Sequence, residues 1–243
     1  MDTQLLTLLR SVDTPTICNA IEVAQGKRGF NAFTRGTMIA SDPKGVMVGY
    51  AVTAQIAALA LPTEDGATIR DRRMAYYKAM AEAPKPSVAV VEDLDYPNCI
   101  GAYWGEVNTT IHKGFGMSGA LTNGVMRDLG DLATNFPVVA ASIGPSHGFV
   151  HVRSVNQPIR VMGMDVLAGD LIHADRHGAV VIPPAVVEQL ESAILKMQST
   201  EKLILDPARA EGFDLPSLKR LGLHSKGPAS KLYMSSPTDW IKF

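Results

Sequence analysis

Apolar residues recur at helical spacing in four separate parts of the chain, and each repeat predicts an amphipathic helix. The first covers residues 5–12. The second begins at Asp13-Thr14-Pro15 and ends at Gly26, because a capping residue and an early proline favour a helix start and glycine favours a helix end. A third covers residues 67–83. The last begins at Pro183-Pro184, and its apolar face is formed by Val187, Leu190, Ile194 and Met197.

Short apolar runs between these helices predict buried β-strands, most clearly the valine-rich run Ser87–Val91. Further strands are expected at Thr37–Ser41, Val46–Val52, Ala54–Leu61, Val138–Ala141, Val150–Val152, Ile159–Val161, Val166–Leu167 and Ala179–Ile182. The pattern predicts an α/β fold with helices packed outside a β-rich core. We expect one domain over residues 1–205, followed by a C-terminal arm over residues 206–243 that lies over a surface or a neighbouring subunit.

Composition narrows the classes of function. The 23 basic and 24 acidic side chains give a formal net charge of −1, which argues against nucleic-acid binding because such binding usually leaves a basic stripe. Cys18 and Cys99 form no metal-type cluster, and a chain of this size needs no disulfide framework. The start of the chain is acidic, and the uncharged stretch 45–63 is too short and too polar to span a membrane. We therefore expect a cytoplasmic protein that binds neither nucleic acid nor membrane.

The segment from Leu121 to Asp128 carries the most informative chemistry. A strand-like run ends in a glycine turn, and Arg127 and Asp128 follow where a helix is expected to begin. Ligand groups collect at strand ends of α/β folds, Asp suits Mg²⁺ or Mn²⁺, and the planar Arg side chain suits a carboxylate or an enolate. The alternative is a surface ion pair in which Asp128 caps the helix, and spacing alone favours this alternative.

A second candidate segment runs from Gly101 to Asn108. Gly101 and Gly105 surround Trp104, which indicates backbone that another group approaches closely and that offers amide donors to an anion. Glu106 follows directly and is suited to proton transfer. The alternative is a helix start in which Glu106 lies favourably near the helix dipole.

Four histidines and one aspartate raise the hypothesis of a zinc site: His147, His151, His173 and His177, with Asp175. Their spacing matches no common zinc pattern, and alternate strand positions place side chains on opposite faces. Hydrogen-bonded structural histidines are the favoured interpretation.

Three groups of motifs together resemble the RraA-like family: Gly105-Glu-Val-Asn108, Thr122-Asn-Gly-Val-Met-Arg127-Asp128, and Gly169-Asp170 with Ala174-Asp175 and Gly178-Ala-Val-Val-Ile-Pro183. That family contains class II 4-hydroxy-4-methyl-2-oxoglutarate / 4-carboxy-4-hydroxy-2-oxoadipate aldolases and regulators of ribonuclease E activity. The likeness covers about residues 14–190. The order and spacing of the motifs are specific, although no single motif is.

The resemblance implies a swivelling β/β/α domain that assembles as a homotrimer or a dimer of trimers, with active sites between subunits. It implies that the pyruvate portion of a 2-oxo acid substrate binds at Gly105, Glu106, Val107 and Asn108. Arg127 and Glu106 are then the catalytic residues, with Arg127 also contacting substrate, and Asp128 anchors a divalent metal, Mg²⁺ or Mn²⁺. The implied reaction passes through a pyruvate enolate, by retro-aldol cleavage or by decarboxylation of oxaloacetate, and needs no lysine nucleophile.

Two positions depart from the family pattern. Asn19 and Asn123 stand where the family usually has acids, so the substrate or the rate is expected to differ. Glu201 and Glu211 are both candidates for an acid that a neighbouring subunit donates. The alternative functions are a non-catalytic protein–protein regulator of a ribonuclease E-type activity and a protein that binds a 2-oxo acid without turnover.

Overall fold

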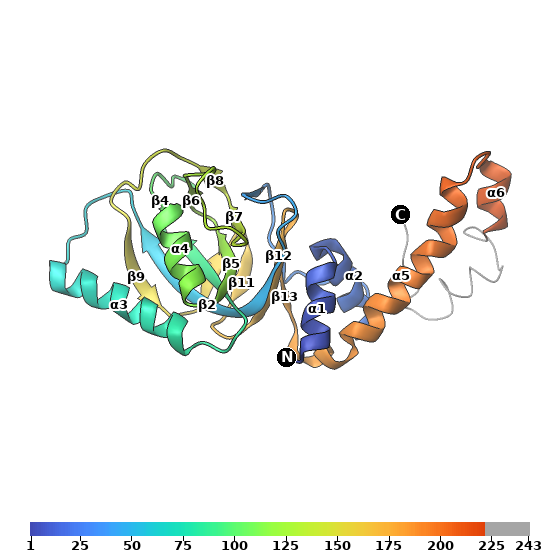
Figure 1. Ribbon diagram of the computed structural model, residues 1–243, viewed down its shortest axis with the longest axis horizontal. Coiled ribbons are helices and arrows are strands. Elements are labelled where there is room, and N and C mark those ends of the chain that lie inside the picture. The colour runs from blue at the N-terminus through green and yellow to red at the C-terminus, as the bar shows by residue number, and fades with distance from the viewer. Residues whose placement is uncertain (222–243) are drawn as a thin grey trace. The chain divides into compact units, whose positions relative to one another are not determined.

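The computed structural model describes residues 1–221 as two compact units. The core unit comprises residues 1–14 and 31–183 and contains every strand of the described chain. The helical unit comprises residues 15–30 and the described residues from 184 onward. Figure 1 traces both units along the chain, from the blue amino terminus to the red helices near residue 221.

All four helices predicted from the apolar spacing are present, and α2 begins and ends within one residue of its predicted bounds. Asp2 caps the first helix by accepting hydrogen bonds from the backbone N–H groups of Gln4 and Leu5, and Asp65 caps α3 in the same way. The helices are α1 (Thr3–Ser11), α2 (Thr14–Gln25), α3 (Gly66–Glu82), α4 (Glu106–Gly114), the 3₁₀ turn η1 (Pro184–Val186), α5 (Val187–Arg209) and α6 (Leu215–Arg220).

A curled mixed sheet forms the centre of the core unit, and its strand order is β1-β7-β5-β3-β2-β12-β13, with β9 paired to β2. The four middle strands β7, β5, β3 and β2 are parallel, whereas β1, β9, β12 and β13 join antiparallel. Its strands are β1 (Ile39–Ala40), β2 (Met47–Ala57), β3 (Ser87–Asp93), β5 (Met117–Thr122), β7 (Val138–Ala140), β9 (His151–Val155), β12 (Leu171–Asp175) and β13 (Gly178–Ile182). The predicted α/β class with a β-rich core is confirmed.

Alternate residues of the central strands serve two separate hydrophobic cores, as the two-residue period of a strand requires. On β3, Ala89 and Val91 pack with Tyr76 and Met80 of α3, whereas Val88 and Val90 face the opposite cluster. The opposite cluster is completed by the antiparallel hairpin of β10 (Ile159–Val161) and β11 (Met164–Val166). Helices and hairpin therefore cover different faces of the sheet.

One predicted pair of strands was wrong, and β12 was missed. The expected strands Val46–Val52 and Ala54–Leu61 form one continuous strand, β2. The polar residue between them, Thr53, is buried in the sheet, and its hydroxyl donates a hydrogen bond to Gln157 O at 2.8 Å. Strand β12 was not predicted, since His173 and Asp175 interrupt its apolar pattern although both side chains are buried.

The helical unit is built around α5, which buries Leu190, Ile194 and Met197 of the predicted apolar face. This helix continues through residue 205 to Arg209, and α6 follows it. The division at residue 205 stays a prediction, and residues 222–243 of the predicted arm lie outside the described residues. No helix within residues 1–221 is long and apolar enough to cross a membrane.

Candidate active site

A small parallel sheet brings together the two segments that the sequence singled out. Strand β4 (Ala102–Trp104) pairs in parallel with β6 (Val125–Met126), which in turn pairs with β8 (Ser142–Ile143). Because parallel strands end at the same edge, the residues after β4 and those after β6 become neighbours. The backbone N–H of Arg127 donates a hydrogen bond to Trp104 O at 2.8 Å. Gly105 and Glu106 therefore lie beside Arg127 and Asp128.

The contacts at this edge are close. Asp128 Oδ2 accepts a hydrogen bond from the backbone N–H of Glu106 at 3.2 Å, and Asp128 Oδ1 lies 3.5 Å from Arg127 Nη1. A β-carbon at Gly105 would overlap Asp128 Oδ2 and lie 3.1 Å from Arg127 Nε. Only glycine fits between β4 and this Arg–Asp pair.

The expectation that a helix begins at Arg127 and Asp128 was wrong. The backbone of Asp128 has a φ of 54°, in the left-handed region that non-glycine residues rarely adopt. Its carboxylate instead lies at the amino terminus of α4, where helix N–H groups favour negative charge. Strained backbone of this kind is concentrated at functional sites, and here it holds the carboxylate beside Arg127.

The guanidinium of Arg127 is only partly satisfied within the protein. Its side chain is 32% exposed, yet Nε is buried and finds no hydrogen-bond partner among residues 1–221. A buried donor without a partner costs free energy unless a ligand satisfies it. The arrangement thus combines an open guanidinium with a 31% exposed carboxylate, a pair suited to an oxyanion and a cation.

The other predicted site residues differ in how well their positions suit ligand binding. Glu106 is the first residue of α4 and is exposed, so its position agrees with the helix-start alternative as well as with access to a ligand. Val107 is exposed and apolar. The side-chain amide of Asn108 donates one hydrogen bond to Tyr103 O at 2.7 Å, which leaves its second N–H and its side-chain oxygen for other contacts.

Asn123 plays a structural part that the sequence did not reveal. Its side chain accepts a hydrogen bond from Asp93 N at 2.6 Å and donates one to Asp93 O at 3.1 Å, so it joins the carboxyl ends of β3 and β5. The carboxyl of Asp93 is buried, its Oδ2 has no partner among the described residues, and burial raises its pKa. The available signal for Asp93 was the pair of acids, Glu92 and Asp93, that follows the valine-rich run Ser87–Val91.

A buried aromatic layer supports β4 and α4 from behind. Trp104 contacts His112 of α4 with ring centroids 4.7 Å apart, and His112 Nε2 lies 3.1 Å from the Tyr76 hydroxyl. Burial lowers the pKa of His112 to about 4, so this imidazole is neutral near pH 7. The layer fixes the direction of α4 and hence the position of Glu106.

The remaining histidines have structural partners. His173 contacts Thr14 Oγ1 at 3.0 Å and Leu9 O at 2.9 Å, while His177 lies 3.1 Å from Asp175. Within residues 1–221 no three His, Cys, Asp or Glu side chains are grouped as they would be to hold a metal ion.

Two short glycine motifs lack the structural context of the chemistry they resemble. Gly144-Pro-Ser-His-Gly148 matches Gly-x-Ser-x-Gly, but it lies in the loop between β8 and β9 rather than in a turn from a strand into a helix. Gly114-Phe-Gly-Met-Ser-Gly119 matches Gly-x-Gly-x-x-Gly, but it runs from α4 into β5, the reverse of the dinucleotide-binding order. Neither motif therefore marks a nucleophile or a dinucleotide site.

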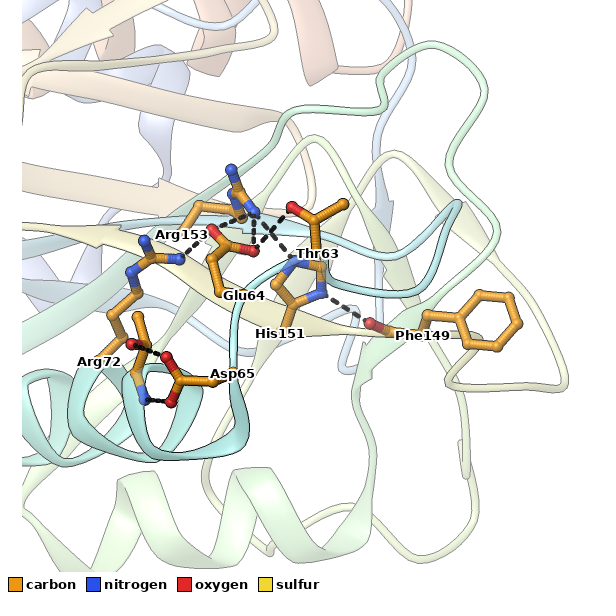
Figure 2. A network of polar contacts seen from close by, with 8 residues as sticks. Thr63, Glu64, Asp65, Arg72, Phe149, His151 and Arg153 are labelled. Atoms are coloured by element: carbon orange, nitrogen blue, oxygen red, sulfur yellow. Dashed lines mark hydrogen bonds and ion pairs between the residues drawn. The ribbon is translucent and has the colours of Figure 1, made fainter.

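A second arginine–carboxylate cluster of the core unit, formed by Glu64, Arg72 and Arg153, has closer contacts than the Arg127–Asp128 pair. Glu64 Oε1 lies 2.7 Å from Arg72 Nη1 and 2.8 Å from Arg153 Nη1, and Figure 2 shows both guanidinium groups converging on this carboxylate. The hydrogen bond from Arg72, then a backbone hydrogen bond and then the charge of Arg153 lower the pKa of Glu64 to about 2. This cluster joins the start of α3 to β9.

The fold and this edge define an α/β protein with an Arg–Asp pair at the ends of parallel strands. The RraA-like family model, described as Aldolase/RraA, matches residues 14–181, and the chain belongs to this family. The predicted family and its fold are thereby confirmed.

Two curated proteins are similar over part of the chain. Protein DlpA of Legionella pneumophila subsp. pneumophila is 28% identical over 126 residues, which cover 51% of this chain and 20% of that protein. A Halalkalibacterium halodurans protein, provisionally named 4-hydroxy-4-methyl-2-oxoglutarate aldolase, is 30% identical over 136 residues, 53% of this chain and 61% of that protein. The chain thus spans less than two thirds of the length of either relative.

A solved structure agrees with the fold. Streptomyces coelicolor RraAS2, an unusual member of the RNase ES inhibitor RraA protein family, superposes with a TM-score of 0.64. The match is 22% identical and covers 83% of this chain and 96% of that chain. At this identity the likeness shows the shared fold alone.

Proposed function

We propose that the protein is a divalent-metal-dependent carbon–carbon lyase that cleaves a 2-oxo acid through a pyruvate enolate. The observation that carries the proposal is the Arg127–Asp128 pair, with its unpartnered buried Nε and its strained Asp128 backbone. Family membership and the relative provisionally named as an aldolase support this class of reaction. The substrates we propose are of the 4-hydroxy-4-methyl-2-oxoglutarate type, with oxaloacetate decarboxylation as a second reaction of the same enolate.

Arg127 is the residue that stabilises developing negative charge in this proposal. Cleavage next to a 2-oxo group leaves an enolate, and a preorganised guanidinium stabilises it better than solvent does because its donors need no rearrangement. The side chain of Arg127 is 32% exposed, so its terminal Nη groups can donate two hydrogen bonds to the substrate's oxygen atoms, while Nε is buried beside Gly105. Backbone of Gly105 lies close enough to Arg127 to limit where the substrate fits.

The residues present fit a weakly held Mg²⁺ or Mn²⁺. Asp128 offers one partly exposed carboxylate, and exposed Glu106 follows Gly105 beside it. Mg²⁺ is typically held by one or two carboxylates together with water and substrate oxygens. When bound, such a metal supplies Lewis-acid polarisation of the 2-oxo group. Glu106 is placed to accept or return a proton at this edge, since its carboxyl is free of side-chain hydrogen bonds within residues 1–221.

The proposed assembly is a homotrimer or a dimer of trimers that acts on a small 2-oxo acid in the cytoplasm. The proposal rests on family membership, and the candidate acids Glu201 and Glu211 belong to α5 and to the turn after it. Their part in catalysis stays a prediction.

A pyruvate-release assay coupled to lactate dehydrogenase tests the function. We expect purified protein to release pyruvate from 4-hydroxy-4-methyl-2-oxoglutarate and from oxaloacetate, to stop when a chelator is added, and to resume with Mg²⁺ or Mn²⁺. The matched control is Arg127→Ala, which removes the proposed enolate partner. Pyruvate release that a chelator does not affect would contradict metal dependence, and absence of release with both substrates would leave the non-catalytic ribonuclease regulator as the better hypothesis.

A further inference from the structure

A hollow of the core unit lies at the amino ends of the parallel strands, and neither Arg127 nor Asp128 lines it. This cavity has a volume of about 830 Å³. Its walls are formed by the residues that precede or begin four neighbouring strands: Gly45 and Val46 before β2, Lys85 and Pro86 before β3, Gly116 to Ser118 at β5, and Asn135 and Pro137 before β7. Residues from α1 and α4 complete it.

Positive charge is concentrated in this cavity although the chain as a whole carries a net charge of −1. Arg10, Lys44, Lys85 and Lys113 line it, against one acid, Asp42. The carboxylate of Asp42 accepts a hydrogen bond from Lys44 N at 2.8 Å and so serves the local turn. Among the described residues none of the four cations forms an ion pair.

Two of the lysines are held in place by backbone carbonyls rather than by carboxylates. Lys85 Nζ donates to Met80 O at 2.7 Å, and Lys113 Nζ donates to Thr134 O at 2.7 Å. Partial burial lowers the pKa of Lys85, as expected for an ammonium group that lacks a counter-ion. These contacts fix both ammonium groups without neutralising them, so their charge is available to an anion.

A smaller cavity of about 320 Å³ adjoins the first, because Arg10, Lys44, Gly45 and Val46 line both. It adds Arg176 and His177 to the lining, and the acids Asp13 and Asp175. The carboxylate of Asp175 is engaged by Thr14 N and His177 N. Arg10 and Lys44 therefore stand between two hollows, where they can contact the middle of an elongated anion.

We propose that this cavity binds a small organic molecule that carries two or more phosphate groups. Three of the four cations in the larger cavity are lysines, which suit phosphate as point charges, whereas planar carboxylate recognition favours arginine. The apolar side chains of Val46, Pro86, Met117 and Pro137 offer a wall for the organic part. The volume lies within the range of small-molecule sites, about 300–1,000 Å³.

This site is distinct from the proposed active site. Helix α4 begins at Glu106, beside Asp128, and Lys113 lies in its last turn. The helix length from Glu106 to Lys113, about 10 Å, therefore separates the proposed active site from the cavity. Binding at the cavity is measured without turnover, and its failure leaves the proposed lyase activity untouched.

Calorimetric titration of the full chain tests the proposal with ATP, inorganic triphosphate and citrate as probes. We expect ATP to bind the wild type, and binding to weaken at least tenfold between 50 and 300 mM salt because exposed charges are screened. Lys44→Gln combined with Lys113→Gln is expected to weaken ATP binding about tenfold or more. The matched control Lys78→Gln removes one exposed lysine from α3 and is expected to change nothing. Arg127→Ala is also expected to bind ATP normally.

Each outcome decides the proposal. Equal affinity for ATP and triphosphate would show that the phosphate groups account for binding. Higher affinity for ATP would show that the apolar wall also contacts the organic part. Both results support the site. Citrate binding as tight as triphosphate, no binding by ATP and triphosphate, or affinity unchanged in the double variant would each overturn it. Circular dichroism of the double variant excludes unfolding as the cause of weaker binding.

Discussion

Two arginine–carboxylate clusters of the core unit differ in how completely they are satisfied. In the cluster of Glu64, Arg72 and Arg153, the charged atoms lie 2.7 and 2.8 Å apart, and the pKa of Glu64 is lowered to about 2 (Figure 2). In the Arg127–Asp128 pair, the charged atoms are 3.5 Å apart and Arg127 Nε has no partner among the described residues.

The difference separates a structural role from a binding role. The Glu64 cluster uses its charges to join the start of α3 to β9, so little remains for a ligand. The Arg127–Asp128 pair keeps a partly exposed guanidinium and carboxylate, and Asp128 has a left-handed backbone of the kind found at functional sites. Incomplete satisfaction at a fixed position is thus the feature that marks the candidate active site.

Replacing Arg127 is expected to have the largest effect on activity. Arg127→Lys should lower turnover about as much as Arg127→Ala, by about 10²-fold or more, because an ammonium cannot supply two parallel donors to an enolate. Steady-state pyruvate release and circular dichroism of both variants measure activity and folding. Full activity in the lysine variant would remove the role assigned to Arg127.

A smaller but still large loss is expected from Gly105→Ala. The new methyl group overlaps Asp128 Oδ2 and crowds Arg127 Nε, so both side chains must shift, and turnover should fall about tenfold or more. Gly130→Ala is the matched control, since a β-carbon there meets no atom within 4 Å. Equal activity of the two variants would show that the close approach at Gly105 does not matter for function.

The Glu64 cluster should respond in stability rather than in activity. Glu64→Gln is expected to lower the melting temperature by about 2 °C at pH 7 while leaving pyruvate release unchanged. Because the pKa of Glu64 is lowered in the folded protein, its stabilisation is present above pH 4.5 and is lost as the pH falls towards about 2.

Thermal melts at a series of pH values check this prediction. The difference between wild type and Glu64→Gln should shrink as the pH falls from 5 towards 2. Glu82→Gln serves as the control, because Glu82 and Lys78 are both exposed and lie 3.8 Å apart. A pH-independent difference for Glu64→Gln would mean that the lost charge is not its cause.

Local patterns were sufficient to predict much of the fold. Periodic leucines predicted α1, and the valine run Ser87–Val91 predicted most of β3. Local patterns failed where polar side chains are buried against partners distant in the sequence. His173 lies inside β12 and contacts Leu9 O and Thr14, about 160 residues earlier in the chain. No local pattern reveals such pairs.

For the candidate site, the sequence supplied the residues but not their arrangement. Glu106 and Asp128 were singled out separately, and the parallel pairing of β4 with β6 that joins them could not be predicted from either segment. The expected helix at Asp128 was wrong: the residue has a φ of 54°, outside the helical region, and its carboxylate contacts Glu106 N, 22 residues away. Glu64, Arg72 and Arg153 were missed for the same reason, since 81 residues separate Arg72 from Arg153.

An activity titration with Mg²⁺ and Mn²⁺ on wild type and Asp128→Asn tests the central claim most directly, with oxaloacetate and 4-hydroxy-4-methyl-2-oxoglutarate as substrates. Asparagine keeps the shape of the side chain but removes its charge, so the account predicts a higher metal requirement and lower turnover in a protein that stays folded. Pyruvate release that needs no metal, or identical titrations for both proteins, would contradict it.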